Sequence, residues 1–84
     1  MLVPVRSVSG VSLVSEGDLL TPRERQTLQL AAEGRTNVET ASRLGISPRT
    51  AEMHRANALR KLGIKTQVDL IRYAIRRGMI PAVE

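Results

Sequence analysis

Three side chains in the second half of the chain have the residue types of a nucleophilic triad, and they are Ser47, His54 and Asp69. Such a triad works only when its members lie within hydrogen-bond reach of one another. A seven-residue offset along one helix places Ser47 and His54 two turns apart, about 10 Å along the axis. A lone histidine on the inner stripe of a helix is more often a packed core residue than a catalytic group or a metal ligand. The sequence also contains no glycine-rich phosphate loop and no usefully spaced carboxylate pair. These patterns argue against an enzyme and indicate no cofactor and no metal.

Basic side chains offer another kind of chemistry, which is the binding of phosphates. The 84 residues include 13 Lys and Arg against 8 Asp and Glu, so the formal net charge is +5. A basic domain favours polyanions because contacts to phosphates release counterions. Tyr73 is the single aromatic residue, and this argues against single-stranded nucleic acid, whose binding proteins stack bases on aromatic rings. A basic protein without such a partner has the same charge, so the pattern of elements must decide.

The clearest element is a helix over residues 47–62. Ser47 is suited to cap its start, Pro48 fits the first helical position, and Gly63 can end it in the left-handed conformation. A narrow, mostly apolar stripe at helical spacing predicts which face of this helix packs inward. The stripe consists of Ala51, His54, Ala58 and Leu62. The opposite face is small, polar and basic, which suits a helix that enters the major groove of DNA.

A shorter helix is predicted just before it, over residues 37–44. Thr36 can cap this helix, and Glu39 completes a capping box three residues later. Gly45 ends the helix and leaves a tight turn before Ser47. A short helix, a turn with glycine and a second helix with a basic outer face form the helix-turn-helix pattern.

Two further helices flank this pair. Thr21 and Glu24 form a second capping box, and Gly34 ends the helix that they begin. Thr66 caps a fourth helix, which runs to about Arg77. The candidates for the inner faces of the first two helices are Leu20, Leu28, Ala31, Ala32, Ala41 and Leu44.

The fourth helix has apolar residues on two sides of its wheel. One stripe consists of Leu70, Ile71 and Ala74. The others lie elsewhere on the wheel, and they are Val68, Ile75 and Met79. A second apolar side indicates a subunit interface, whereas a wide core stripe closed by the C-terminal tail fits the spacing equally well.

The chain is long enough for one small domain with one core. Residues 1–19 are rich in Val, Ser and Gly, and we expect them to form a flexible arm or linker before a domain over residues 20–80. The absence of cysteine excludes disulfides and thiolate sites. No apolar run approaches the roughly 18 residues that suggest a membrane span. The N-terminus is not a convincing signal peptide, so we expect a cytoplasmic protein without a membrane partner.

Several short motifs occur in a fixed order along the chain. They are Leu20-Thr21-Pro22-Arg23-Glu24-Arg25, then Gly34, Asn37, Glu39 and Ala41, then Leu44-Gly45-Ile46-Ser47-Pro48-Arg49-Thr50, His54-Arg55-Ala56-Asn57 and Lys61-Leu62-Gly63. Together they closely resemble the LuxR-type DNA-binding domain, and within it the FixJ/NarL response-regulator branch. The resemblance covers about residues 19–80. Each motif is weak alone, but the order and spacing of so many make the resemblance specific.

The resemblance implies an all-α, four-helix helix-turn-helix domain whose second and third helices scan and recognise double-stranded DNA. It implies a sequence-specific transcription regulator, either an effector domain or a stand-alone protein. Such a regulator binds two half-sites as a homodimer, with the helix over 47–62 in the major groove. RNA polymerase is a candidate further partner. The dimer contacts on the fourth helix are Val68, Ile71, Arg72 and Ile75.

The same resemblance assigns DNA contacts to the third helix. The residues expected to face bases are Glu52, Met53 and Ala56. The residues expected near phosphates are Arg49, Thr50, Arg55 and Lys61. Glu52 departs from the family, which often has lysine at this position. Because a glutamate can accept a hydrogen bond from cytosine N4 and repels phosphate, it shifts the emphasis from affinity toward specificity.

Four positions carry smaller or more polar residues than the aliphatics common in the family, and they are Thr27, Thr40, Ala51 and Ala58. Each lost methylene weakens burial by about 0.8 kcal/mol. The sequence therefore predicts a thin core and modest stability.

Two other interpretations remain open. A stand-alone chain of this kind could be an interaction module that heterodimerises with related regulators through the fourth helix and antagonises them. Binding of duplex DNA by the purified homodimer separates the two functions. The promoter-reading helix-turn-helix of a sigma factor starts with a similar Thr-Pro-Arg-Glu run, but the fourth helix after Gly63 and the segment 54–57 favour the LuxR type.

Overall fold

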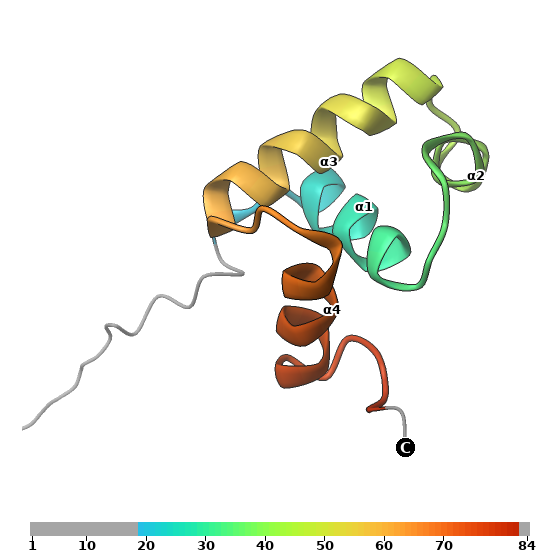
Figure 1. Ribbon diagram of the computed structural model, residues 1–84. Coiled ribbons are helices and arrows are strands. Elements are labelled where there is room, and N and C mark those ends of the chain that lie inside the picture. The colour runs from blue at the N-terminus through green and yellow to red at the C-terminus, as the bar shows by residue number, and fades with distance from the viewer. Residues whose placement is uncertain (1–18, 83–84) are drawn as a thin grey trace, which may run out of the picture.

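The computed structural model describes residues 19–82, and within this range it contains four α-helices and no strand. They are α1 (Pro22–Ala32), α2 (Asn37–Leu44), α3 (Pro48–Leu62) and α4 (Gln67–Arg76) (Figure 1). The predicted all-α class and the four predicted helices are confirmed. The arm or linker expected at residues 1–19 lies, apart from Leu19, outside the described residues. None of the helices within 19–82 is long and apolar enough to cross a membrane.

Each helix begins where its capping residue predicts. In every case the side-chain oxygen of the capping residue accepts a hydrogen bond from the backbone N–H three residues later, at 3.1 Å. The capping residues are Thr21, Thr36, Ser47 and Thr66. In α1 and α2 the capping box is complete, because Glu24 and Glu39 accept hydrogen bonds from the backbone N–H groups of the caps at 3.0 and 2.9 Å. The helix starts are therefore fixed by local hydrogen bonds.

Left-handed glycines end the two helices of the helix-turn-helix pair. Gly45 and Gly63 both have a φ of +69°, a region that side chains with a Cβ rarely adopt. Gly45 turns the chain within three residues from the end of α2 to the start of α3. Gly63 ends α3 before the connection to α4. These two residues set the length of α3 and its direction relative to α2.

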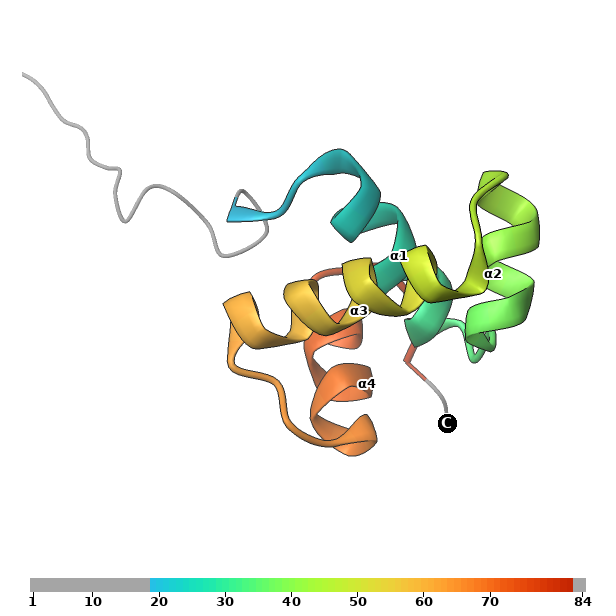
Figure 2. The ribbon, with the colours of Figure 1, turned by 90° about the horizontal axis from the view of Figure 1, so that it is seen from above.

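α1 is the helix against which the other three pack. α3 lies across α1 and also contacts α2, which stands beside its N-terminal half (Figures 1 and 2). α4 packs against α1 and leaves one long side of α3 at the outside of the domain (Figure 1). α3 therefore packs with one side on α1 and α2 and has its other side exposed.

The core is aliphatic apart from one aromatic ring. Its buried members are Leu20, Leu28, Ala31, Ala32, Ala58, Leu70, Tyr73 and Ala74. Tyr73 is 4% exposed and was not among the predicted core residues. Four residues predicted on inner faces or apolar stripes are only half-buried, and they are Leu44, His54, Leu62 and Ile71. On α4 the buried positions are taken by Tyr73 together with Leu70 and Ala74.

All four of the unusually small or polar positions lie inside the domain: Thr27, Thr40, Ala51 and Ala58 are at most 3% exposed. The hydroxyl of Thr27 donates to the backbone carbonyls of Arg23 and Glu24, both at 3.0 Å. This buried hydroxyl is therefore satisfied within its own helix. The modest stability that these residues imply stays a prediction.

Candidate nucleic-acid interface

One side of α3 packs on the scaffold and the other faces outward. Ala51 and Ala58, on the inner side, are fully buried. Outward-facing residues on the first turns of the helix are exposed, and they are Arg49, Glu52, Met53 and Ala56. The helix therefore presents a surface of its own in the N-terminal half of its length.

An open depression runs along this exposed surface. It is lined by Arg49, Thr50, Glu52, Met53 and Ala56. The structure thus brings together all three residues expected to face bases and two of the four expected near phosphates. The side chain of Met53 is half-exposed, at 50%. We call this set of five residues the α3 depression.

The basic end of the α3 depression coincides with the start of the helix. Arg49 is exposed in the first turn, where the positive end of the helix dipole also favours anions. The hydroxyl groups of Ser47 and Thr50 form a hydrogen bond of 2.9 Å, which holds Thr50 against the helix cap. This end of α3 suits contacts with phosphate oxygens.

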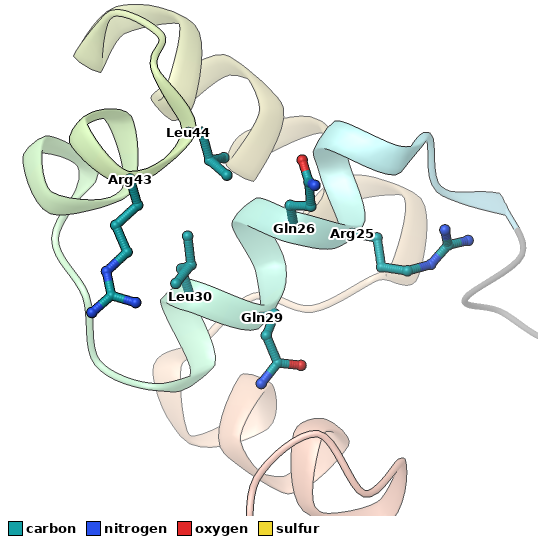
Figure 3. Close-up of a pocket in the computed structure, with 6 residues that line it drawn as sticks. All are labelled: Arg25, Gln26, Gln29, Leu30, Arg43 and Leu44. Carbon is teal, nitrogen blue, oxygen red and sulfur yellow. The ribbon is translucent and has the colours of Figure 1, made fainter.

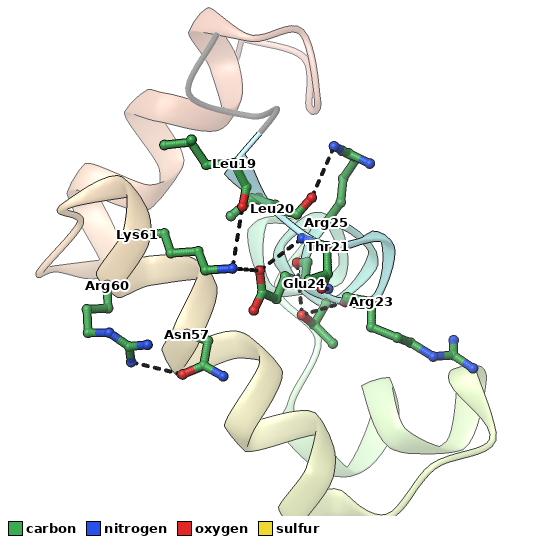
Figure 4. Close-up of polar contacts among 10 residues, drawn as sticks. Leu19, Leu20, Thr21, Arg23, Glu24, Arg25, Asn57, Arg60 and Lys61 are labelled. Atoms are coloured by element: carbon green, nitrogen blue, oxygen red, sulfur yellow. Dashed lines mark hydrogen bonds and ion pairs between the residues drawn. The ribbon is translucent and has the colours of Figure 1, made fainter. Parts of the chain in front are cut away.

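The other two expected phosphate contacts lie outside the α3 depression. Arg55 is half-buried on the flank of α3. Lys61, in the last turn, reaches back to α1, where its Nζ lies 2.7 Å from Oε1 of Glu24 (Figure 4). The same ammonium group donates a longer hydrogen bond of 3.4 Å to the carbonyl of Leu19. Lys61 therefore has a structural partner that the sequence analysis missed, because no local pattern relates residues 37 positions apart.

Glu24 is held in its ionised form by these contacts. The hydrogen bond from Lys61 lowers the pKa of Glu24 below its ordinary value of 4.5, and the backbone N–H of Thr21 lowers the pKa further. Burial of the carboxylate acts in the opposite direction. The side chain of Glu24 is 6% exposed, so its charge is matched inside the domain and is not available at the surface.

A further hydrogen bond orders the C-terminal half of α3. The guanidinium group of Arg60 donates to the side-chain carbonyl of Asn57 at 2.9 Å, one turn away (Figure 4). Arg60 is exposed, whereas Asn57 is half-buried. The sequence places Arg60 on the outer face and in the last turn of this helix, but it does not predict the bond to Asn57, and the place of Arg60 beyond Ala56 extends the basic flank of the helix.

The three residues of the rejected triad serve local structure. Ser47 caps α3 and bonds to Thr50. His54 is half-buried in α3. Asp69 lies in the first turn of α4, where its backbone N–H donates to Thr66. No group of three His, Asp or Glu side chains within residues 19–82 could hold a metal ion.

A second open depression lies between α1 and α2. Leu30 and Leu44 point into the space between the two helices (Figure 3). The polar residues on its rim are Arg25, Gln26, Gln29 and Arg43. Gln29 donates hydrogen bonds of 2.8 Å to Glu33 and to the carbonyl of Met79, so it ties α1 to the segment after α4. None of the residues expected to contact DNA lies in this second depression.

The residues expected at a dimer interface lie on the outer part of α4. Val68 is 59% exposed. Arg72 is exposed, and Ile71 and Ile75 are half-buried. The buried side of α4 is formed by other residues, which are Leu70, Tyr73 and Ala74. A partly apolar strip on α4 thus remains uncovered within the described part of the chain.

Comparison with known proteins places these features in context. A family model described as bacterial regulatory proteins, luxR family, matches residues 18–74. The transcriptional regulatory protein MctR of Rhizobium johnstonii is 54% identical over 71 residues, which are 83% of this chain and 33% of MctR. The transcriptional regulatory protein UhpA of Escherichia coli is 47% identical over 55 residues, which are 66% of this chain and 28% of UhpA.

A solved structure with the same fold is that of full-length FixJ from B. japonicum. It superimposes with a TM-score of 0.72 at 36% identity, and the match covers 83% of this chain and 34% of the FixJ chain. This chain therefore spans 28–34% of the length of MctR, UhpA and FixJ. The part of this chain that matches these proteins includes the helical domain, and in this chain that domain carries the α3 depression.

Proposed function

This chain belongs to the luxR family of bacterial regulatory proteins, whose helix-turn-helix domain binds DNA in transcription regulation, and from this premise we propose how it engages its site. α3 enters the major groove of double-stranded DNA, which has room for one α-helix. The observation that carries this proposal is the α3 depression, because it gathers exposed basic, acidic and apolar side chains on one outward surface of a single helix.

The proposed contacts divide by chemistry. Glu52, Met53 and Ala56 face base edges, because they occupy the middle of the exposed surface. Phosphates are contacted by residues around them, and these are Arg49, Thr50, Arg55 and Lys61. Phosphate contacts position the domain on the duplex, whereas base contacts specify the sequence. For Lys61 the role requires that the ammonium group shares its charge between Glu24 and DNA, and its 34% exposed side chain makes this sharing sterically feasible.

Two copies of the domain bind two half-sites as a homodimer through α4, with Val68, Ile71, Arg72 and Ile75 in the interface. The support is the partly apolar strip that these residues form on the outer part of α4. Symmetric dimers match symmetric operators, since half-site spacing mirrors the two-fold relation of the subunits. We propose that the domain spans about residues 20–80 and follows an arm or linker at residues 1–19. The protein is proposed to act in the cytoplasm on double-stranded DNA, with RNA polymerase as a candidate further partner, and to have no enzymatic activity.

A second candidate function uses α4 alone. In this version the chain pairs with a related regulator through the strip around Val68 and prevents it from binding DNA. The observation in its favour is the 59% exposure of an aliphatic side chain on this helix. Glu52, which repels phosphate, is tolerable in such an antagonist.

Fluorescence anisotropy of a labelled random duplex of about 25 base pairs tests the main proposal. Titration of the duplex with the protein at low and at moderate salt should show binding that weakens steeply as salt rises, since phosphate contacts release counterions. A folded protein that fails to bind the duplex at low salt would refute direct DNA binding and favour the antagonist.

A further inference from the structure

We propose that the α3 depression reads the 5-methyl group of thymine next to a cytosine, so that the preferred half-site has a T·A pair within about two base pairs of a C·G pair. This inference rests on the proposed function, because it names the sequence that the DNA interface selects. It follows from the chemistry of the three residues in the middle of the depression.

The middle of the α3 depression is partly apolar. Met53 is 50% exposed, and Ala56 is exposed beside it one turn along the helix. Neither side chain has a strong hydrogen-bonding group. In the major groove the one apolar group on the base edges is the C5-methyl of thymine. An exposed methionine and alanine in the middle of a reading surface therefore select thymine by apolar contact.

Glu52 is the acidic residue of the α3 depression. Within residues 19–82 the carboxylate of Glu52 takes part in no ion pair. An ionised carboxylate can only accept hydrogen bonds. Cytosine presents the N4 amino donor, whereas adenine presents its N6 donor directly beside the N7 acceptor, which repels a carboxylate. Glu52 therefore favours cytosine.

The spacing of these side chains along α3 limits how far apart the contacted bases can be. Glu52 and Ala56 are four residues apart in α3, so they are separated by about 6 Å along the helix axis. Successive bases of one strand are about 3.4 Å apart along the duplex. The three side chains consequently reach base pairs no more than about two steps apart. The thymine and the cytosine belong to one half-site and are read together.

The thymine methyl contact has an expected size. Burial of one methyl-sized group stabilises a complex enough to change affinity about fourfold. Methionine is flexible and polarizable, so it can follow the methyl group over small shifts of α3 in the groove. Replacement of thymine by deoxyuridine removes this methyl group and leaves base pairing unchanged. The predicted cost of this replacement is thus about fourfold in affinity for each contacted thymine.

The experiment starts with the full chain and a pool of random duplexes, from which bound sequences are selected. In the selected duplex each thymine is then replaced singly by deoxyuridine, and affinity is measured by fluorescence anisotropy. We expect a thymine within about two base pairs of a C·G pair whose replacement weakens binding about fourfold. With Met53→Ala the same replacement should have almost no effect at the thymine that Met53 contacts, because that side chain is truncated.

Val38→Ala is the matched control, since Val38 is a 65% exposed aliphatic residue on α2 outside the α3 depression. This variant should retain the full penalty of deoxyuridine. A selected half-site without such a thymine, or an equal penalty for the unmodified protein and Met53→Ala, overturns the inference while DNA binding stands. Absence of salt-sensitive binding to any duplex by the folded protein overturns the proposed function itself, and the inference with it.

Discussion

The ammonium group of Lys61 lies 2.7 Å from the carboxylate of Glu24, and this ion pair joins the end of α3 to the start of α1. The two residues are 37 positions apart in the sequence. Glu24 is almost fully buried, while Lys61 keeps about a third of its side chain in contact with solvent. The pair therefore ties the C-terminal end of α3 to α1, at the end of α3 that lies away from the helix-turn-helix turn.

Removal of the cation should destabilise the domain. In Lys61→Met the buried carboxylate loses its charged hydrogen-bond donor, and we expect the free energy of unfolding to fall by about 2 kcal/mol. Urea denaturation followed by circular dichroism measures this change. Lys65→Met is the control, because Lys65 is exposed beyond the end of α3. Equal midpoints for the two variants would show that the ion pair contributes no stability.

Stability should also fall in acid because of Glu24. Its pKa is lowered in the folded state, chiefly by the hydrogen bond from Lys61. A lowered pKa means that the unfolded chain binds a proton more readily, so the contribution to stability is present above pH 4.5 and is lost as the pH falls through the pKa of the folded state. Urea denaturation from about pH 6 to about pH 3 should show a steeper loss for the unmodified chain than for Glu24→Gln. Parallel curves would contradict this prediction.

Arg55 is expected to act on phosphates. Arg55→Ala should weaken binding to all duplexes alike and reduce the slope of log affinity against log salt by about one. Anisotropy titrations at several salt concentrations provide the slope. Arg76→Ala is the control, because it removes the same charge from an exposed position on α4 instead of α3. A loss confined to one DNA sequence would instead assign Arg55 to base reading.

Val68 tests the proposed dimer. A carboxylate in the middle of an apolar interface is desolvated without a partner, so Val68→Glu should abolish self-association of the chain. Sedimentation equilibrium should give a dimer for the unmodified chain and a monomer for this variant. Leu19→Glu is the control, since Leu19 is similarly exposed, at 53%, and lies away from α4 in the sequence. Identical association of both variants and the unmodified chain would exclude α4 as the interface.

The sequence predicted the helices well because their limits depend on neighbouring residues. The capping boxes at Thr21 and Thr36 and the glycine at position 45 act over three or four residues, and the structure has each helix where they indicate. Packing was harder to predict. On α4 the spacing suggested Ile71 for the core, but Tyr73 is the buried residue, because the position of α4 against α1 decides which side is covered.

The residues of the α3 depression could be predicted from the sequence, whereas the contact between Lys61 and Glu24 could not. The residues of the α3 depression could be named because the resemblance to a known family placed them on one helix. Periodicity alone indicated only an outer face that is small, polar and basic. The engagement of Lys61 by Glu24 could not be predicted, since it depends on how α3 crosses α1.

The carboxylate of Glu24 links the start of α1 to the packing of α3. A single oxygen, Oε1, accepts both the backbone N–H of Thr21, at 3.0 Å, and the ammonium group of Lys61, at 2.7 Å. The first bond belongs to the capping box at the start of α1, and the second ties α3 to α1. A chain with α1 formed but α3 undocked has a carboxylate with only its local partner, so helix initiation and tertiary docking reinforce each other. The cap of the first helix and the placement of α3 thus depend on the same carboxylate oxygen.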